Sequence, residues 1–460
     1  MAPKPDTITK ITVRGFKSIC DRQEVEIRPL TLLAGANSSG KSSLMQPLLL
    51  LKQTLEAPSD PGALLLDGPN VRFTKAEQMF SRGEPVYGRG EPVTDFSVRM
   101  ELSYGQSLEL TFKWEKEVGF NVASMEFPVS MMFPRWMNLA GWKKIAEKGL
   151  HVHLDREMSS EDIQKNLPSR VVQSYNRVLR NEETETPTWS VRRDRCFLAL
   201  ELSGTADRHG HALSVYSGWD FIPHLKGLIH LPGLRGNPER TYPKYATGPL
   251  FPGDFADYVA SVITEWQKQG DPRVKELGKA LEDMGLTWKV EAKHVDDTQV
   301  ELRVGRLTHS KRGGAHDLVS IADVGFGVSQ CLPVVVALIA AQPGQLVYLE
   351  QPEIHLHPLA QRKLAHVIKR ATEKGIVAIV ETHSALLLKE IQTLVAKGEL
   401  DKDIVKLHWF QRQEDGRTKI TSADLDENGA FGPWPEDFDE VELDAEKDYL
   451  DAVESREFHS

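Results

Sequence analysis

A glycine-rich segment at residues 35–42 has the composition and spacing of a loop that binds phosphate. Its sequence is GANSSGKS, in which two glycines precede a lysine and a serine. The glycines let several backbone N–H groups converge on phosphate oxygens at the start of the following helix. The lysine then reaches the β- and γ-phosphates of a nucleotide, and the serine hydroxyl holds Mg²⁺. We expect the contacts to the nucleotide to come from Gly35, Asn37, Ser38, Gly40, Lys41, Ser42 and Ser43.

The segments on either side of this loop fit the same interpretation. Residues 8–34 contain two alternating runs rich in β-branched residues, which predict short strands, and Lys41–Glu56 predicts a helix. A strand, a loop and a helix in this order form the setting that a phosphate loop requires. The alternative is a glycine-rich turn that arose by chance, and the setting argues against it.

Acidic residues and a histidine follow two later apolar runs. LVYLEQPEIHLHP at 346–358 predicts a buried strand ending in an acidic turn, and GIVAIVETHS predicts a second strand ending at His383. Glu350 is our candidate for the Mg²⁺ site together with Ser42, and the histidine is placed to contact the γ-phosphate or the attacking water. Either feature alone would more often be plain surface, but their order after a phosphate loop favours a catalytic role.

A second glycine-containing helix start lies at residues 323–330. Its sequence is DVGFGVSQ, and the apolar run CLPVVVALIAA follows it. Such a helix start also binds anions, yet a site with one phosphate loop needs no second one. Its natural ligand is therefore the nucleotide held by another subunit. The contacts would come from Gly325, Gly327, Ser329 and Gln330. Standing alone, the segment would be interpreted as a helix start without a ligand.

The bulk composition limits the function classes. The chain has 460 residues, of which 40% are hydrophobic and 27% charged, as in ordinary globular proteins. A net charge of −10 excludes a protein that coats nucleic acid along its whole surface, although a local patch could still bind DNA or RNA. We expect a cytoplasmic protein without membrane contact, because no apolar run is long enough to span a bilayer. Cys20, Cys196 and Cys331 lack metal-ligand spacing, so we expect buried free thiols.

The pattern along the chain divides it into four parts. We expect the first part of a nucleotide-binding core at 1–95 and an inserted α+β subdomain at 96–226. Alternating runs on both sides of Gly105 predict an antiparallel hairpin near the start of the insertion. The second part of the core is expected at 227–395, and a small acidic extension at 396–460. No sustained heptad is present, so we expect no coiled-coil arm.

The motifs together resemble one family of ATPases. FKSI, GANSSGKS, DVGFGVSQ, LEQPEIHLHP and ETHS, spread over residues 8–56 and 227–440, are similar to motifs of the compact ABC-type ATPases related to the RecF, structural-maintenance-of-chromosomes and overcoming-lysogenization-defect proteins. The chain most resembles the bacterial "AAA family ATPase" group often found in defence islands. The resemblance implies an α/β fold: a P-loop NTPase of ABC-ATPase type, with a mixed sheet flanked by helices, an inserted α+β subdomain and a small C-terminal β extension. It also implies ATP and Mg²⁺ as cofactors.

The resemblance implies a shared site as well. In such families a head-to-tail dimer encloses two ATP molecules, each between the P-loop of one protomer and the signature segment of the other. Gly327 and Ser329 would reach across the interface. The residues of the P-loop side would be Lys41, Ser42, Glu350 and His383. We therefore expect a homodimer or a higher even-numbered assembly.

The chain departs from the family pattern at the catalytic position. The family usually has an acidic residue directly after the metal-binding carboxylate, and Gln351 occupies that position here. A glutamine orients a water molecule but cannot take its proton. The resemblance thus implies an ATPase whose hydrolysis is slow, or one that relies on Glu353 or His383 as the base.

Two further assignments rest on the resemblance. GFGVSQ can be aligned with Gly327 at the γ-phosphate or with Ser329 and Gln330 there, and both registers stay open. The family also carries a glutamine linked to the metal, for which Gln78 in FTKAEQMF is the candidate.

Acidic and histidine clusters allow other interpretations. Asp424 and Asp426 form a D-x-D pattern that could belong to a nuclease, and Glu353 with His355 and His357 could ligate a metal. The hairpin-like surroundings of the first pair favour a surface role. The second group recurs in the turn of the resembling family, which favours a structural role.

Basic residues gather in three places. Most such clusters are solvated faces, but any of them could contact DNA or RNA phosphates. The second cluster follows a buried strand, which favours a position near the nucleotide or the dimer interface. The clusters are Arg192, Arg193 and Arg195; Arg235, Arg240 and Lys244; and Lys311 and Arg312.

We expect an ATP-dependent dimeric switch that controls a separately encoded effector, in bacterial antiviral defence if the resemblance holds. No Toprim nuclease is expected after His383. One alternative is a DNA repair or recombination ATPase that binds DNA ends or gaps, and its mark would be a continuous basic groove. The other is an essentially non-hydrolysing scaffold in which ATP is a permanent ligand.

Overall fold

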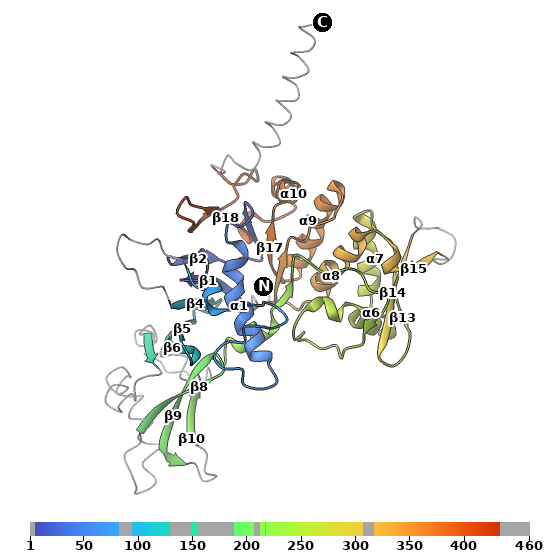
Figure 1. Ribbon diagram of the computed structural model, residues 1–460. Helices are drawn as coiled ribbons and strands as arrows, with labels where there is room; N and C mark the ends of the chain where they lie inside the picture. Colours follow the sequence, from blue (N-terminus) through green and yellow to red (C-terminus); the bar gives the residue numbers. More distant parts are fainter. Residues whose placement is uncertain are drawn as a thin grey trace, which may run out of the picture.

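A computed structural model describes residues 5–81, 94–128, 149–153, 188–206, 212–216, 218–306 and 317–432 (Figure 1). Its central sheet is parallel except at one edge, where β19 runs antiparallel to β18. The strands, in spatial order, are β11 (Ile229–Leu231), β16 (Leu346–Glu350), β17 (Val377–Thr382), β3 (Leu30–Gly35), β18 (Val405–Arg412) and β19 (Thr418–Ala423).

The inner strands are apolar runs because both faces of the sheet are covered. All six residues of β3 and all six of β17 are buried, as expected for central parallel strands. Alternate residues face opposite sides, so Leu33 packs with the helix after the P-loop, whereas Leu32 packs with the helices on the other face.

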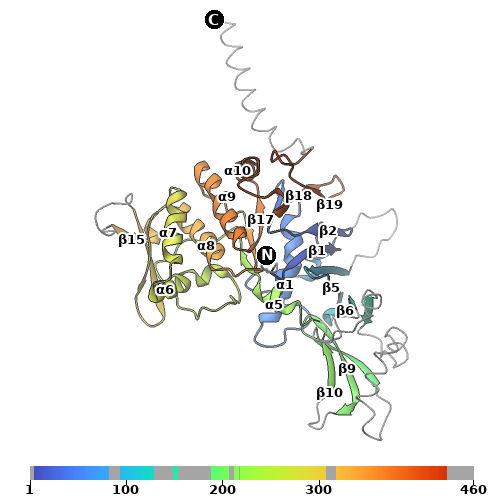
Figure 2. The same ribbon diagram turned by 180° about the vertical axis from the view of Figure 1, so that it is seen from behind.

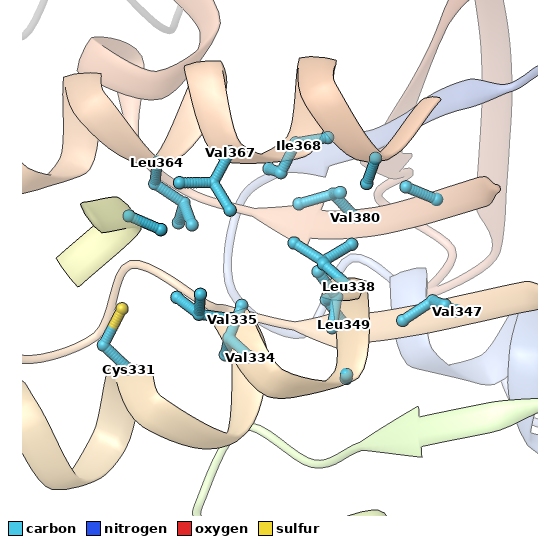
Figure 3. Packing of buried hydrophobic residues seen from close by; sticks show 14 of the residues in the cluster. Cys331, Val334, Val335, Leu338, Val347, Leu349, Leu364, Val367, Ile368 and Val380 are labelled. Atoms are coloured by element: carbon cyan, nitrogen blue, oxygen red, sulfur yellow. The ribbon is translucent and has the colours of Figure 1, made fainter. Parts of the chain in front are cut away.

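Helices form the layers on both faces. One face carries α1 (Lys41–Glu56) and α5 (Ile222–Gly227). The other carries α8 (Phe326–Ala340), α9 (Pro358–Glu373) and α10 (Ala385–Ala396). Figure 3 shows side chains of α8 and α9, among them Val335 and Val367, packed against β16 and β17. Both helical layers thus fix the strand ends that carry the candidate site residues.

A second, antiparallel sheet packs beside α1. Its strands are β2 (Gln23–Glu26), β1 (Ile8–Arg14), β4 (Asp95–Leu102), β5 (Ser107–Glu115), β6 (Gly119–Pro128) and β7 (Gly149–His153). The predicted hairpin around Gly105 is present as β4 and β5. Three more strands, β8 (Thr188–Asp194), β9 (Phe197–Ala206) and β10 (Ala212–Tyr216), form a separate sheet.

A helical lobe covers α8. It contains α6 (Val259–Gln269) and α7 (Arg273–Asp283), which Gly270 separates with a φ of 66°. Its strands are β12 (Tyr242–Pro243), β13 (Val290–His294), β14 (Gln299–Gly305) and β15 (Leu318–Ser320). Figures 1 and 2 show this lobe and the β1–β6 sheet on opposite sides of the central region.

The strand pairings bear on the division of the chain, which stays a prediction. β4 pairs directly with β1, so residues on both sides of the expected boundary at 95/96 share one sheet. β18 pairs with the P-loop strand β3, so the C-terminal hairpin is built onto the central sheet.

None of the helices in the described residues is both long and apolar enough to cross a bilayer.

Candidate nucleotide site

The P-loop joins β3 to α1, and its two glycines are required by space and by backbone angle. Gly35 has a φ of 142° and Gly40 a φ of 102°. A Cβ on Gly35 would lie 2.2 Å from the carbonyl oxygen of Phe410, and one on Gly40 would lie 2.3 Å from Oγ1 of Thr418. Another residue at Gly35 would displace the backbone of β18, and one at Gly40 would displace the side chains of Thr418 and Ser18.

The loop leaves an anion-binding helix start. Gly40 is the N-cap of α1 and supplies no side-chain cap, so the first N–H groups of the helix stay available to phosphate. Lys41 is 3% exposed, and its Nζ donates to the carbonyl oxygens of Gly35 and Ala36 at 3.0 and 2.8 Å. Burial lowers the pKa of Lys41, and the nearby Glu381 and Glu353 oppose this shift. Bound phosphate would favour the charged form further.

The remaining P-loop positions differ in exposure. Asn37 and Ser38 are exposed, and Ser38 has a positive φ of 59°. Ser43 is buried on α1, which indicates a packing position. Thr418 of β19 helps to hold the loop, because its hydroxyl contacts Ser18 Oγ and the Ser39 carbonyl oxygen, both at 2.7 Å.

A carboxylate that the sequence analysis missed faces the serine of the P-loop. Ser42 Oγ lies 3.0 and 2.9 Å from the two carboxylate oxygens of Glu381 on β17. The hydroxyl of Tyr348 donates to the same carboxylate at 2.8 Å. Burial, and next the charge of Glu350, raise the pKa of Glu381. The available signal was a charged residue inside the otherwise apolar strand VAIVET.

Glu350 lies beside Glu381, since the two residues are partners in the β16–β17 register. Its carboxylate is 3.1 Å from Nε2 of His230 and accepts the N–H of Gly233 at 3.2 Å. Asn70 lies 3.3 Å from the other ring nitrogen, so the ring proton belongs on Nε2 and is donated to Glu350. Burial opposes ionisation, but these hydrogen bonds leave the pKa of Glu350 below its usual range. His230, on a three-residue strand, was also missed.

Gln351 and Glu353 occupy the turn after β16. Gln351 has a positive φ of 44°, and its N–H donates to the Glu381 carbonyl oxygen at 2.7 Å. Glu353 is 7% exposed, and its Oε1 accepts the Thr382 hydroxyl at 2.7 Å and the His383 N–H at 2.8 Å. Glu353 therefore holds the end of β17 in place.

His383 is neutral near pH 7. Burial, and next the charge of Lys41, lower its pKa to about 4, whereas a backbone hydrogen bond with Gly35 acts in the opposite direction. The structure thus brings the histidine to the P-loop, as expected from the strand order. A base with this pKa accepts a proton poorly at neutral pH.

The signature segment exposes some residues and buries others. Gly325 is the exposed N-cap of α8, and Phe326 is 52% exposed. Ser329 and Gln330 are 9% and 5% exposed. Ser329 Oγ donates to the Phe326 carbonyl oxygen at 3.0 Å, and Gln330 Nε2 donates to Gly236 at 2.7 Å. A Cβ on Gly327 would lie 3.4 Å from the His355 carbonyl oxygen.

The loop after β11 connects this segment to Glu350. Arg235, in this loop, donates to the carbonyl oxygens of Glu350 at 3.4 Å and Gln351 at 3.1 Å. The next residue, Gly236, accepts the side chain of Gln330. One short loop therefore contacts the carboxylate strand and the signature helix.

Gln78 lies in a different setting. Its side-chain oxygen accepts the N–H groups of Thr74 and Lys75 at 3.0 and 3.3 Å, so it caps its own turn. The following residue, Met79, accepts the N–H of Lys17. The charge of Glu350 acts on the Lys17 ammonium, whose pKa burial lowers. The metal role of Gln78 stays a prediction.

The alternative metal clusters have structural partners. Asp424 pairs with Lys406 and Arg28, and Asp426 accepts the N–H groups of its own turn. His357 caps α9 by accepting the N–H of Leu359. In the described residues, no group of three or more His, Cys, Asp or Glu side chains could hold a metal.

Most basic clusters also have internal partners. Arg193 pairs with Asp60, and Arg195 caps the end of α1 through the carbonyl oxygens of Thr54 and Ala57. Arg240 pairs with Asp323, and Arg192 and Lys244 are exposed. Lys311 and Arg312 lie outside the described residues. Of the three free thiols, those of Cys196 and Cys331 are buried as expected, whereas Cys20 is half-buried.

The donor atoms at the strand ends fit a hard cation. A serine hydroxyl and carboxylate oxygens are the ligands that Mg²⁺ prefers beside a nucleotide phosphate. Ser42, Glu381 and Glu350 supply these donors. When bound there, Mg²⁺ would neutralise charge on the β- and γ-phosphates.

Comparisons with known proteins agree with a nucleotide-binding domain. Residues 220–389 match the family model described as "AAA domain, putative AbiEii toxin, Type IV TA system". No curated protein matches the chain.

Three solved structures are similar at low identity. An SMC head bound to the C-winged helix domain of ScpA is 12% identical, with a TM-score of 0.44, covering 91% of this chain and 98% of that one. The SMC head domain from Thermotoga maritima is 11% identical, with a TM-score of 0.38 and coverages of 91% and 100%. An Smc head domain with an extended coiled coil, bound to the C-terminal domain of ScpA derived from Pyrococcus furiosus, is 11% identical, with a TM-score of 0.42 and coverages of 91% and 96%. The fold assignment rests on the strand order and the P-loop.

β17, which ends just before His383, lies between the P-loop strand and the Glu350 strand, and helices cover both faces of the sheet. With the antiparallel sheet beside α1, this arrangement is that of a P-loop NTPase of the ABC-ATPase type. The chain is therefore a nucleotide-binding ATPase by class.

Proposed function

We propose that this ATPase is a dimeric switch in which ATP and Mg²⁺ join two copies of the chain. The supporting observation is that one molecule has two separate helix starts suited to phosphate, one in the P-loop and one at α8. The P-loop has a complete set of phosphate-binding groups around Lys41. The start of α8 is exposed at Gly325 and Phe326 and contacts His355 and its own turn; among the described residues it forms no hydrogen bond or ring contact with residues 35–42. A second copy can supply its partner.

The residues have separate tasks in this proposal. Lys41 and the N–H groups of α1 bind the phosphates, and Ser42 with the carboxylates positions the metal. The α8 start of the second copy adds N–H groups to the γ-phosphate, so the dimer is stable only while that phosphate is present. The exposure of Gly325 and Phe326 favours the register in which Gly327, and not Ser329 or Gln330, approaches the phosphate.

The side chains near the γ-phosphate favour slow hydrolysis. Gln351, at the position of the usual base, cannot accept a proton. With its low pKa, His383 is a weak base. A slow reaction keeps the ATP-bound dimer in place long enough to hold or release another protein, which suits a switch better than a motor.

We propose further that the switch controls a separately encoded effector in bacterial antiviral defence. The description of the matched family model names a putative toxin and a Type IV TA system. This description and the resemblance of the motifs support the proposal. A repair ATPase is the weaker candidate, because Arg193, Arg195 and Arg240 already have internal partners.

Substitution of Lys41 tests the switch. We expect Lys41→Ala to weaken binding of AMP-PNP at least about 100-fold, because it removes the buried cation facing the phosphates, and to abolish nucleotide-dependent dimers. Calorimetry and light scattering with Mg²⁺ and AMP-PNP measure the two effects. Lys279→Ala, an exposed lysine of α7, is the control. Dimers of the Lys41→Ala protein with unchanged nucleotide dependence would remove the proposal.

A further inference from the structure

We propose that Glu381 is a metal-directed carboxylate of the nucleotide site, acting together with Glu350 on the same Mg²⁺ ion. This inference rests on the proposed ATP and Mg²⁺ site, but not on dimer formation. It assigns a role to Glu381, the first residue of ETHS. The sequence alone pointed only to His383 in that motif.

The first support is distance. Ser42 is the P-loop hydroxyl whose oxygen would bind the metal, and it lies within 3.0 Å of both oxygens of Glu381. Mg²⁺ binds oxygen at about 2.0–2.1 Å and keeps several water ligands. A carboxylate in hydrogen-bond contact with one metal ligand is therefore within reach of the ion or of its bound water.

The second support is that Glu381 has no cation in direct contact, although the charge of Lys41 lies near it. The carboxylate is 5% exposed, and the ion pairs among the described residues do not include it. Its side-chain partners are the hydroxyls of Ser42 and Tyr348, while Nζ of Lys41 donates to backbone carbonyls. A buried, ionised carboxylate without a cation in direct contact is costly. A divalent ion beside Ser42 would remove this cost.

The third support is the contrast with Glu350. Both oxygens of Glu350 already have fixed donors, the ring of His230 and the N–H of Gly233. These donors fix the orientation of the Glu350 carboxylate, as hydrogen-bond partners of metal ligands do in metal sites. Glu381 and Glu350 are partners in register on adjacent strands, so one ion at the strand ends can interact with both, directly or through water.

Mn²⁺ binding in the presence of AMP-PNP, followed by electron paramagnetic resonance, tests the proposal without relying on turnover. We expect Glu381→Gln to weaken Mn²⁺ binding at least about tenfold, while binding of AMP-PNP without metal is not weakened. Glu381→Asp, which keeps the charge on a shorter side chain, should retain more affinity than Glu381→Gln and provides the test if the glutamine variant folds poorly. Glu390→Gln is the control, because Glu390 is similarly buried but pairs with Arg362 and His366.

The outcomes separate this inference from the switch. If Mn²⁺ affinity in Glu381→Gln and in Glu381→Asp stays within twofold of wild type while Glu350→Gln loses tenfold, Glu381 has no metal role. If the affinity falls in the Glu381 variants but wild type stays monomeric with Mn²⁺ and AMP-PNP, the metal assignment holds and the dimeric switch fails.

Discussion

The P-loop and the signature segment are both glycine-containing helix starts, but they differ in burial and in the contacts that support them. Around the P-loop, Lys41 is buried and the loop is supported by β18 and β19. At the start of α8, Gly325 and Phe326 are exposed, and Gln330 is turned inward to the loop at Gly236. The first helix start is preorganised inside one chain, whereas the second is exposed, as the proposed contact with a second copy requires.

The largest expected effect comes from placing a negative charge on the exposed helix start. Phe326→Asp should weaken nucleotide-dependent dimerisation about 1,000-fold, because like charges brought together at an interface cost several kcal/mol. Binding of AMP-PNP to the monomer should change less than twofold. Sedimentation velocity measures the first quantity and calorimetry the second.

Val118→Asp is the matched control, since Val118 is an exposed apolar residue in the turn between β5 and β6. Equal dimerisation of both variants would show that α8 does not face the partner's phosphates, and the comparison of the two helix starts would lose its functional meaning.

A smaller effect is expected on the P-loop side, where a base can be added. Gln351→Glu should raise ATP turnover about 100-fold, because a positioned general base contributes 10²–10⁴-fold to such reactions. The dimer should become shorter-lived as a result. Phosphate release under single-turnover conditions measures the rate. Unchanged turnover would place the attacking water elsewhere, and measurable turnover in the wild type would exclude the permanent-ligand scaffold.

A moderate effect is expected for the loop after β11, which contacts both α8 and the strand that carries Glu350. Gln330→Leu removes the hydrogen bond to Gly236 and should weaken nucleotide-dependent dimers about tenfold, since one such bond contributes about 1 kcal/mol or slightly more. The comparison variant is Gln345→Leu, which lies beyond the C-terminal end of α8 and loses its bond to the Gly227 carbonyl oxygen and the one it accepts from the Gln342 N–H. If both variants weaken the dimer equally, the loop at Arg235 does not couple the two half-sites.

The same contrast explains what the sequence could predict. Lys41–Glu56 was predicted as a helix with the bounds of α1, because the P-loop is a local motif whose glycines and helix start are adjacent in sequence. The roles of Glu381 and His230 depend on which strands become neighbours, and that is set by distant packing. The inward turn of Gln330 likewise depends on a loop far away in the chain.

Burial also hid Glu381 from sequence reasoning. Glu381 stands in an apolar run, where a charge at a strand end is commonly interpreted as the border of the strand. Its partner Ser42 is close only because β17 lies beside β3. β18 was expected in a small extension for the same reason, since nothing local indicates that it pairs with the P-loop strand.

The smallest expected effect is the pH dependence that His383 gives to the stability of the nucleotide-free protein. Its folded pKa of about 4 is below the usual value of 6.5, so the folded state binds fewer protons than the unfolded state between these values. The stability present above pH 6.5 is therefore lost as the pH falls toward 4. His383→Asn, which cannot be protonated, should show a weaker fall. Because His383 is only half-buried and His408 has a similarly low pKa, we expect a difference of a few degrees or less in melting temperature. Melting curves of both proteins from pH 7 to pH 5 measure it. A larger fall in the variant would mean that the P-loop side stabilises a charged histidine, contrary to the buried and neutral site described here.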